Sequence, residues 1–261
     1  MITSGNDYLP RFLTVKRRVR ETGDTFTLVL DEKSDAKPGQ FFMLSVPGIG
    51  EAPISVASGP GRELEFTIRN VGKVTSALGK AEKIGIRGPY GNQWPSDDYD
   101  RILAIAGGIG IPPIRSLLER MVDEDRGEQL EVLYGARTPD DLVYSSEIDK
   151  WAEATNVKLT VDKGSSSWKG NVGFVTSLIS KSKSPKSAAV FIIGPPLMMK
   201  NAVSEVLKSG FVEDRIFLSL ERRMECGIGA CGHCNIGRYY VCESGPIFAL
   251  KDVKDEPELF L

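Results

Sequence analysis

The four cysteines of this chain constrain its fold more than any other sequence feature. They lie near the C-terminal end with the spacing C-x4-C-x2-C-x7-C, and the rest of the chain contains no cysteine. Four thiolates in one short loop can hold an iron–sulfur cluster, and the first two spacings match the plant-type [2Fe–2S] pattern. The glycines between them suit a backbone that bends tightly around such a group. The candidate metal ligands are Cys226, Cys231, Cys234 and Cys242.

A structural zinc site is the alternative use of four thiolates. Zinc loops commonly combine two pairs of closely spaced ligands, whereas seven residues separate Cys234 from Cys242. Disulfides fit less well, because they are rare in the cytosol, where we expect this chain. His233, the only histidine, lies in the same loop, but four thiolates already complete a cluster. The spacing therefore favours an iron–sulfur cluster held by the cysteines, with zinc left as the alternative.

The composition indicates a globular protein and disfavours some partners. Hydrophobic residues make up 41% and charged residues 26% of the 261 residues, which is ordinary for a folded soluble protein with room for two domains. The formal net charge of -2 argues against nucleic acid as the main partner. No apolar run approaches the roughly 20 residues that span a bilayer, and residues 1–20 lack the apolar centre of a signal peptide. We therefore expect a cytoplasmic protein without a membrane span.

The first part of the chain has the pattern of a small antiparallel β-barrel. Short segments rich in β-branched and aromatic residues alternate with Gly and Pro, as in a series of strands joined by turns. We expect strands at residues 12–20, 25–30, 40–46, 54–58, 63–69 and 83–88. This pattern predicts a barrel domain over residues 1–97.

The pattern changes near residue 98 to apolar strands that alternate with helices. Strands are expected at residues 101–106, 130–134, 157–161, 189–193 and 216–220, with helical patterns that include residues 175–180 and 197–208. Pro112 and Pro113 open a helix whose apolar stripe runs from Ile114 to Met121. Alternation of this kind predicts a parallel sheet covered on both faces, over residues 98–218. Residues 219–261 form a predicted cluster-binding tail.

Glycines follow the first predicted strand of this sheet, at the edge where such folds bind ligands. They let the backbone approach a pyrophosphate, and the N-terminus of the next helix supplies N–H donors. The spacing G-G-x-G-x-P differs from the dinucleotide fingerprint G-x-G-x-x-G, so a tight turn without a ligand remains the alternative. Two later strand ends add small residues at the same edge. The candidate nucleotide-binding residues are Gly107, Gly108, Gly110, Pro112, Gly135, Arg137, Gly194 and Pro195.

With these motifs in order, residues 8–220 resemble the ferredoxin–NADP reductase superfamily. The run LERRMECGIGACGHC at residues 220–234, followed by VCESGPIF at residues 241–248, resembles the iron–sulfur electron-transfer-subunit branch of that superfamily. That branch includes gamma subunits of cytosolic nickel–iron hydrogenases (sulfhydrogenases), the B subunit of anaerobic sulfite reductase and the electron-transfer subunit of dihydroorotate dehydrogenase. The hydrogenase and sulfite reductase members look most similar.

The resemblance implies FAD in the barrel. The family's R-x-Y-[ST] flavin motif aligns with residues 52–55, which read A-P-I-S. Ser55 would hydrogen-bond near flavin N5, while the motif's Arg and Tyr are absent, so Ile54 can pack against the ring but cannot stack on it. Residues 68–75 match the family's second flavin segment, where Arg69 is a substitute for the missing Arg or else a solvated strand arginine. The implied FAD-binding residues are Pro53, Ile54, Ser55, Ile68, Arg69, Gly72, Val74 and Thr75.

The resemblance further implies an NAD(P)H-linked flavin oxidoreductase that is a subunit of a hetero-oligomeric complex. Hydride would pass between NAD or NADP and FAD, and single electrons would pass through the [2Fe–2S] cluster to or from a hydrogenase- or sulfite-reductase-type partner subunit. The family's C-G-P motif reads I-G-P at residues 193–195, so no thiol acts there, and no side chain is assigned a catalytic role. The alternatives are a dihydroorotate dehydrogenase electron-transfer subunit, a self-sufficient NAD(P)H:ferredoxin reductase, and a non-catalytic binding module with structural zinc. The choice of NAD or NADP and the direction of electron flow stay open.

Overall fold

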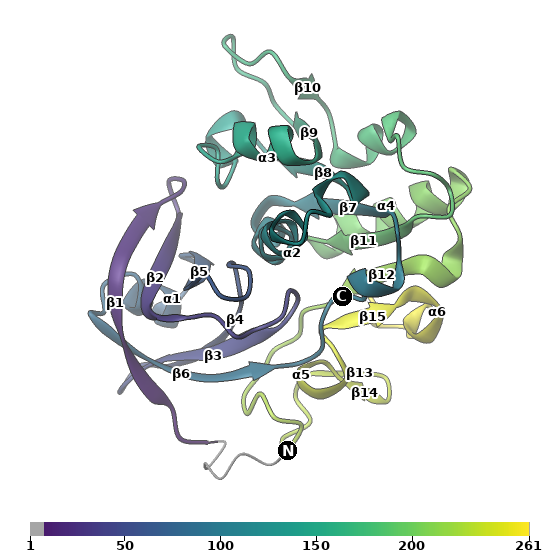
Figure 1. The fold of residues 1–261 in the computed structure, drawn as a ribbon. Coiled ribbons are helices and arrows are strands. Elements are labelled where there is room, and N and C mark those ends of the chain that lie inside the picture. Colours follow the sequence, from purple (N-terminus) through teal and green to yellow (C-terminus); the bar gives the residue numbers. More distant parts are fainter. Residues whose placement is uncertain (1–7, 261) are drawn as a thin grey trace.

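The structure, a computed structural model, describes residues 8–260. Residues 1–7 and residue 261, at the ends of the predicted first and third domains, lie outside the described residues. Figure 1 shows a curled sheet on one side, a second sheet on the other, and the C-terminal segment against both. Within residues 8–260, no helix is long and apolar enough to cross a membrane.

The first sheet is antiparallel throughout and has the strand order β4-β3-β6-β1-β2-β5. Its strands are β1 (Arg11–Arg20), β2 (Thr25–Lys33), β3 (Phe41–Val46), β4 (Gly50–Ser55), β5 (Glu63–Arg69) and β6 (Lys83–Tyr90). The Ala57 N–H, just after β4, donates to the Glu65 carbonyl of β5 at 2.9 Å. This bond joins the two ends of the strand order, so the sheet curls on itself. The short helix α1 (Lys73–Leu78) follows β5.

The predicted strand at residues 54–58 is wrong in position, because β4 begins earlier and ends at Ser55. The chain after Ser55 changes partners: the Val56 N–H donates to the Gln40 carbonyl at 3.0 Å, and the next residue bonds to β5. Pro53 lies inside β4, at the end of the strand order. Proline has no N–H to donate, and at this position the missing donor does not interrupt the hydrogen bonds between central strands. Inward residues of the sheet, such as Leu28, Phe42 and Phe66, form its core.

The second sheet is parallel except for its last strand and has the order β10-β9-β8-β7-β11-β12-β15. Its strands are β7 (Ile102–Gly107), β8 (Leu130–Ala136), β9 (Asn156–Val161), β10 (Asn171–Val172), β11 (Ala189–Ile193), β12 (Ile216–Ser219) and β15 (Ile247–Ala249). Its α-helices are α2 (Ile111–Asp123), α3 (Ile148–Ala154) and α4 (Pro196–Lys208). Short 3₁₀ helices are η1 (Ser96–Asp98), η2 (Gly108–Gly110), η3 (Gly127–Gln129), η4 (Pro139–Asp141), η5 (Val175–Lys181) and η6 (Glu213–Arg215).

Both faces of this sheet are covered, as expected for buried parallel strands. Alternate residues of β7 enter different cores: Leu103 and Ile105 pack on one face, and Ile102 and Ala104 on the other. The helical pattern predicted at residues 175–180 forms the 3₁₀ helix η5, whereas the pattern at residues 197–208 forms α4. The parallel sheet predicted from the sequence is therefore present.

The cysteine-rich segment is tied to both sheets. It contains the hairpin strands β13 (Asn235–Ile236) and β14 (Tyr239–Tyr240) and the short helices α5 (Val241–Ser244) and α6 (Leu250–Val253). Its strand β15 pairs antiparallel with β12, so part of the segment is built into the second sheet. Asn92, which follows β6, donates from Nδ2 to the Ser244 carbonyl at 3.0 Å and accepts from the Ile247 N–H at 2.9 Å. The domain limits given above remain predictions.

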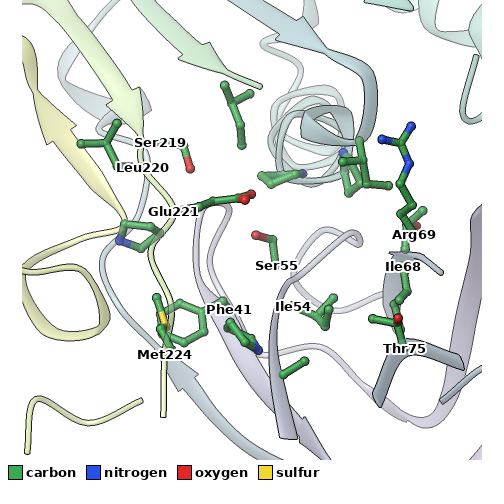
Figure 2. A pocket seen from close by; sticks show the side chains of 18 of the residues that line it. Phe41, Ile54, Ser55, Ile68, Arg69, Thr75, Ser219, Leu220, Glu221 and Met224 are labelled. Carbon is green, nitrogen blue, oxygen red and sulfur yellow. The ribbon is translucent and has the colours of Figure 1, made fainter. Parts of the chain in front are cut away.

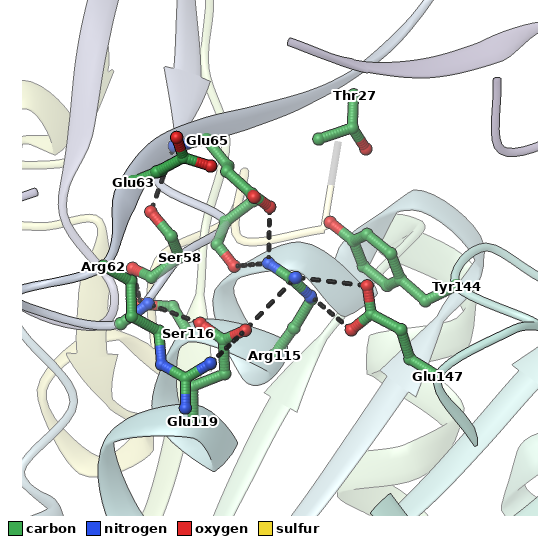
Figure 3. A network of polar contacts seen from close by, with 12 residues as sticks. Thr27, Ser58, Arg62, Glu63, Glu65, Arg115, Ser116, Glu119, Tyr144 and Glu147 are labelled. Atoms are coloured by element: carbon green, nitrogen blue, oxygen red, sulfur yellow. Dashed lines mark hydrogen bonds and ion pairs between the residues drawn. The ribbon is translucent and has the colours of Figure 1, made fainter. Parts of the chain in front are cut away.

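A buried arginine joins the curled sheet to the parallel-sheet domain (Figure 3). Arg115 of α2 donates from Nη1 to the Ala57 carbonyl and to Glu65 Oε2, both at 2.9 Å. Its Nε and Nη2 donate to the Glu147 carboxylate at 2.8 and 3.1 Å, and Nη2 lies 3.1 Å from Glu119 Oε1. Because α2 begins at the glycine-rich turn, this network fixes that turn relative to the curled sheet.

Candidate functional site

A cavity of about 320 Å³ lies between the two sheets. It is lined by β4 and β5, by the start of α2, and by the chain that follows β12 (Figure 2). The residues predicted to bind FAD that line it are Pro53, Ile54, Ser55, Ile68, Arg69 and Thr75. Pro112, which was predicted at the nucleotide site, lines this cavity instead of the second one described below. The structure therefore brings both flavin segments together around one space.

Gly72 and Val74 do not line the cavity, unlike the other residues predicted to bind FAD. Gly72 immediately precedes α1, and its N–H donates to Thr75 Oγ1 at 2.9 Å. The Val71 N–H donates to the same oxygen at 3.1 Å, so the Thr75 hydroxyl satisfies backbone donors at the start of α1. Val74 packs against the core of the curled sheet. These residues shape the helix end beside the cavity.

Arg69 lies at the junction of two cavities, because its side chain lines both. Its side chain is 30% exposed, and Nε lies 3.4 Å from Asp24 Oδ2, an ion pair without hydrogen-bond geometry. A guanidinium has five N–H donors, so the Asp24 contact leaves donors for an anionic ligand. This position is more enclosed than a solvated strand arginine would be.

Glu221 is a residue whose place in the site was not predicted. It lies two residues after the end of β12, and Figure 2 shows its carboxylate extending across the cavity toward Ser55. Desolvation by the surrounding protein raises the pKa of the Glu221 carboxyl above its usual value, although the residue as a whole is exposed. A polar residue at the carboxyl end of a parallel strand is a signal for a ligand site, and this signal was available in the sequence. Other unpredicted lining residues are Phe41, Ser219, Leu220, Arg222 and Met224.

A second cavity, of about 330 Å³, lies at the carboxyl edge of the parallel sheet. The predicted nucleotide-binding residues that line it are Gly107, Gly108, Gly135, Arg137 and Pro195. Gly110 and Gly194 do not line it; a Cβ on Gly110 would lie 2.9 Å from the Ile193 carbonyl oxygen, so this glycine allows α2 to approach β11. Unpredicted lining residues include Asp141, Asp162, Phe174 and Leu197. The two cavities share Arg69 and Ile109 and are therefore adjacent.

The four cysteines come together in two pairs. Cys234 and Cys242 are buried, with their Sγ atoms 3.3 Å apart. Cys226 is partly buried and Cys231 is exposed. Hydrogen bonds from the His233 backbone, and then from Cys226, lower the pKa of the Cys231 thiol, whereas burial raises the pKa of the Cys242 thiol to about 12. All four thiols are free of disulfide bonds.

The backbone around the thiols fits a bound inorganic group. The Gly229 N–H donates to Cys242 Sγ at 3.0 Å, and the Ile228 N–H to Cys226 Sγ at 3.5 Å. Gly229 has φ +76°, and a Cβ there would lie 2.9 Å from Glu243 Oε2. Such a left-handed, crowded position requires glycine. Loops around iron–sulfur clusters direct N–H donors at sulfur in this way.

Arg87 of β6 holds the cysteine loop against the curled sheet. Its Nη1 donates to the Cys226 carbonyl at 3.1 Å, and its Nη2 lies 2.7 Å from Glu51 Oε2 of β4. The Arg87 side chain is only 3% exposed. Because β4 also lines the first cavity, one buried cation connects the wall of that cavity to the first cysteine.

Sequence models of two families match the chain. That of the oxidoreductase NAD-binding domain matches residues 104–204, and that of the iron–sulfur cluster binding domain of dihydroorotate dehydrogenase B matches residues 221–254. Sulfhydrogenase 1 subunit gamma of Pyrococcus furiosus is 38% identical, over 88% of this chain and 85% of its own length. The probable dihydroorotate dehydrogenase B (NAD(+)) electron transfer subunit of Pyrococcus abyssi is also 38% identical, over 86% of this chain and 83% of its own.

Solved structures have the same architecture. An NADH-dependent reduced ferredoxin–NADP oxidoreductase, described for flavin-based electron bifurcation, superposes with a TM-score of 0.77 and 25% identity over 98% of this chain and 93% of its own. A ferredoxin–NADP⁺ reductase from Neisseria gonorrhoeae, solved with FAD and NADP, has a TM-score of 0.66 and 17% identity over 80% of this chain and 97% of its own, and so shows the fold alone. The chain belongs to the family of electron-transfer oxidoreductase subunits that contains sulfhydrogenase gamma subunits and dihydroorotate dehydrogenase B electron transfer subunits, as its sequence motifs predicted.

Proposed function

We propose that this chain is the FAD- and [2Fe–2S]-carrying subunit of a cytoplasmic, hetero-oligomeric oxidoreductase, linking NAD(P)(H) to a partner catalytic subunit of hydrogenase or sulfite reductase type. One observation carries the proposal. The segment after β12 lines the first cavity through Leu220, Glu221 and Met224 and then reaches Cys226. The wall of the flavin site therefore continues into the first cluster ligand.

The first cavity fits FAD. It offers the Ser55 hydroxyl to a polar ring edge, the apolar side chain of Ile54 to a ring face, and the Arg69 guanidinium to a pyrophosphate. Arg69 thus supplies the positive charge of the Arg that the family motif has and this chain lacks. Ile54 replaces the missing Tyr only as an apolar packing surface.

The thiol arrangement favours [2Fe–2S] over zinc. Each iron of a [2Fe–2S] cluster takes two thiolates, and here Cys234 contacts Cys242 while Cys231 hydrogen-bonds to Cys226. A zinc ion needs four ligands around one point, whereas two separate pairs of thiols fit two irons. Four thiols without a disulfide bond also suit the reducing cytosol.

The chemistry that these groups supply when bound is two-electron hydride exchange at the flavin and one-electron transfer at the cluster. The chain's own residues position the groups and limit water. Arg87 and Asn92 fix the cysteine loop against the sheets, and Arg115 fixes the nucleotide turn against the curled sheet. The names of the relatives support partners of the sulfhydrogenase or dihydroorotate dehydrogenase kind; co-expression with each candidate partner subunit distinguishes them.

A series of single Cys→Ser variants tests the cluster assignment. Cys226→Ser, Cys231→Ser, Cys234→Ser and Cys242→Ser should each lower iron content and bleach visible absorption, since each removes one thiolate ligand. His233→Ala is the matched control from the same loop, and its iron content should equal that of the unaltered chain. A cysteine variant with full iron and an unchanged spectrum would remove that residue from the ligand set. Loss of iron in His233→Ala would add the histidine to it.

A further inference from the structure

The first cavity determines which end of the second cavity would hold the nicotinamide of a bound dinucleotide. Arg69 and Ile109 line both cavities, so they mark the end of the second cavity next to the proposed flavin site. Hydride exchange requires the nicotinamide ring at that end, because the reacting atoms must approach to about 3–3.5 Å. The adenosine half of a dinucleotide must then lie toward β8 and β9, where Arg137, Asp141 and Asp162 line the cavity.

Two exposed apolar side chains line the second cavity. Phe174 follows β10 and is 72% exposed, and Leu197 of α4 is 70% exposed. Large apolar side chains exposed at the rim of a pocket are typical of ligand contacts, and a flat adenine base is the part of a dinucleotide that such surfaces accept. Phe174 follows β10, which pairs with β9, so its exposed ring supports adenosine at the end of the cavity toward β8 and β9.

The charges at the adenosine end are mainly negative. Asp141 Oδ1 lies 3.2 Å from Arg137 Nη2, and Asp141 Oδ2 accepts a hydrogen bond from Thr138 Oγ1 at 2.8 Å. Arg137 is the one guanidinium that lines this end; it contacts Asp141 through a single nitrogen, and its side chain is 68% exposed, so it offsets only one of the carboxylates. Asp162 adds a second carboxylate immediately after β9. The two carboxylates leave a net negative charge where the adenosine ribose would lie.

We propose that the nucleotide of this chain is NAD(H) rather than NADP(H), with Asp141 and Asp162 as the selectivity residues. A carboxylate accepts hydrogen bonds from ribose hydroxyls, the arrangement by which dinucleotide folds select NAD. The extra 2′-phosphate of NADP carries a charge of about -1.5 to -2 near neutral pH, as phosphate monoesters do, and the carboxylates repel it. This inference rests on the proposed function for the position of the nicotinamide.

Binding of the oxidised nucleotides tests the inference without any turnover. We expect calorimetry on the purified chain to give NAD⁺ a lower Kd than NADP⁺ by on the order of tenfold or more. Asp141→Asn and Asp162→Asn should each shift the ratio of the two Kd values toward NADP⁺ by several-fold, and the double variant more. Asp140→Asn removes the same charge from the neighbouring exposed residue, which does not line the cavity, and it should leave the ratio unchanged.

Tighter binding of NADP⁺ by the unaltered chain would overturn the inference. A ratio that stays the same in Asp141→Asn and Asp162→Asn, or that moves equally in Asp140→Asn, would overturn the assignment to these residues. Anaerobic reduction of the bound flavin separates this test from that of the proposed function. If NAD⁺ binds selectively but NADH does not reduce a flavin, the selectivity stands and the proposed function fails. If NADPH reduces the flavin faster than NADH at equal concentration, the proposed function stands and the selectivity fails.

Discussion

Replacing Arg115 by Met removes the cation that holds the two sheet domains together while keeping a long side chain. Arg115 contacts the carboxylates of Glu65, Glu119 and Glu147, and its own side chain is only 9% exposed. The side chains of Glu65 and Glu119 are also largely buried, being only 14% and 9% exposed. Removing one partner of a buried ion pair costs about 3–5 kcal/mol, because the remaining charges are left without compensation. We therefore expect Arg115→Met to lower the free energy of unfolding by about that amount at pH 7.

The loss should depend on pH in a defined direction. Burial raises the pKa of the Glu65 and Glu119 carboxyls, while Arg115 opposes that rise. Without Arg115 both pKa values rise further. A carboxyl whose pKa is raised in the folded state destabilises the fold as the pH rises through that pKa, and it has no such effect below the unfolded value of about 4.3. The destabilisation of Arg115→Met should therefore be largest at pH 7 and smaller at pH 5.

Urea unfolding followed by circular dichroism at both pH values measures this difference. Arg11→Met is the control, because Arg11 pairs with Glu32 on the surface and its side chain is 45% exposed. An exposed pair contributes about 0–1 kcal/mol, so the control should change little at either pH. The reasoning is refuted if Arg115→Met loses no more stability than Arg11→Met, or if its loss is the same at pH 5 and pH 7.

Three further variants test other parts of the structure. Although burial alone would raise it, hydrogen bonds from Lys158 and Ser184 lower the pKa of Glu131 to about 2; this carboxylate should contribute about 3 kcal/mol above pH 4.5, lost as the pH falls toward 2. Glu131→Gln should therefore be less stable than the unaltered chain at pH 6 and equally stable near pH 2, as acid titrations in urea would reveal. Thr75→Ala removes the hydroxyl that accepts two N–H groups at the start of α1; it should weaken FAD retention on gel filtration, and full retention would contradict the alignment of the second flavin segment. Glu221→Gln removes a carboxyl whose pKa is raised by desolvation, although the residue is exposed; the flavin-free chain should gain a little stability at pH 7 but not near pH 4, and equal gains at both would show that desolvation of the charge is not the cause.

The sequence predicted the features that depend on local pattern. The alternation of apolar residues indicated most strands of both sheets, though not β10 and not the position of β4, and the cysteine spacing indicated one loop. It did not predict that Ile247–Ala249 pairs with β12, because a strand of three residues has no periodic signal and its partner is distant in the chain. It also missed Asp141 and Asp162 as parts of the second cavity, since an acidic residue in a loop gains this position only when neighbouring strand ends meet.

The resemblance and the structure differ in an informative way at the second flavin segment. Gly72 and Val74 were expected beside the pyrophosphate, yet neither lines the cavity. The motif positions are retained because they build the start of α1: Gly72 precedes the helix and Val74 packs on the core. A motif therefore predicts which segment forms a site more reliably than it predicts which side chains of that segment face the site.

The most direct test of the account is cofactor analysis of the chain purified anaerobically without added cofactors, followed by a titration with NADH monitored by absorption and EPR. The account predicts about two irons and one FAD per chain, bleaching of the flavin by NADH, and a rhombic signal from a single reduced cluster. Reduction of the flavin and cluster by NADPH instead of NADH would change only the choice of nucleotide. One zinc per chain and no flavin would contradict the central claim, and the chain would then be a binding module with a structural metal.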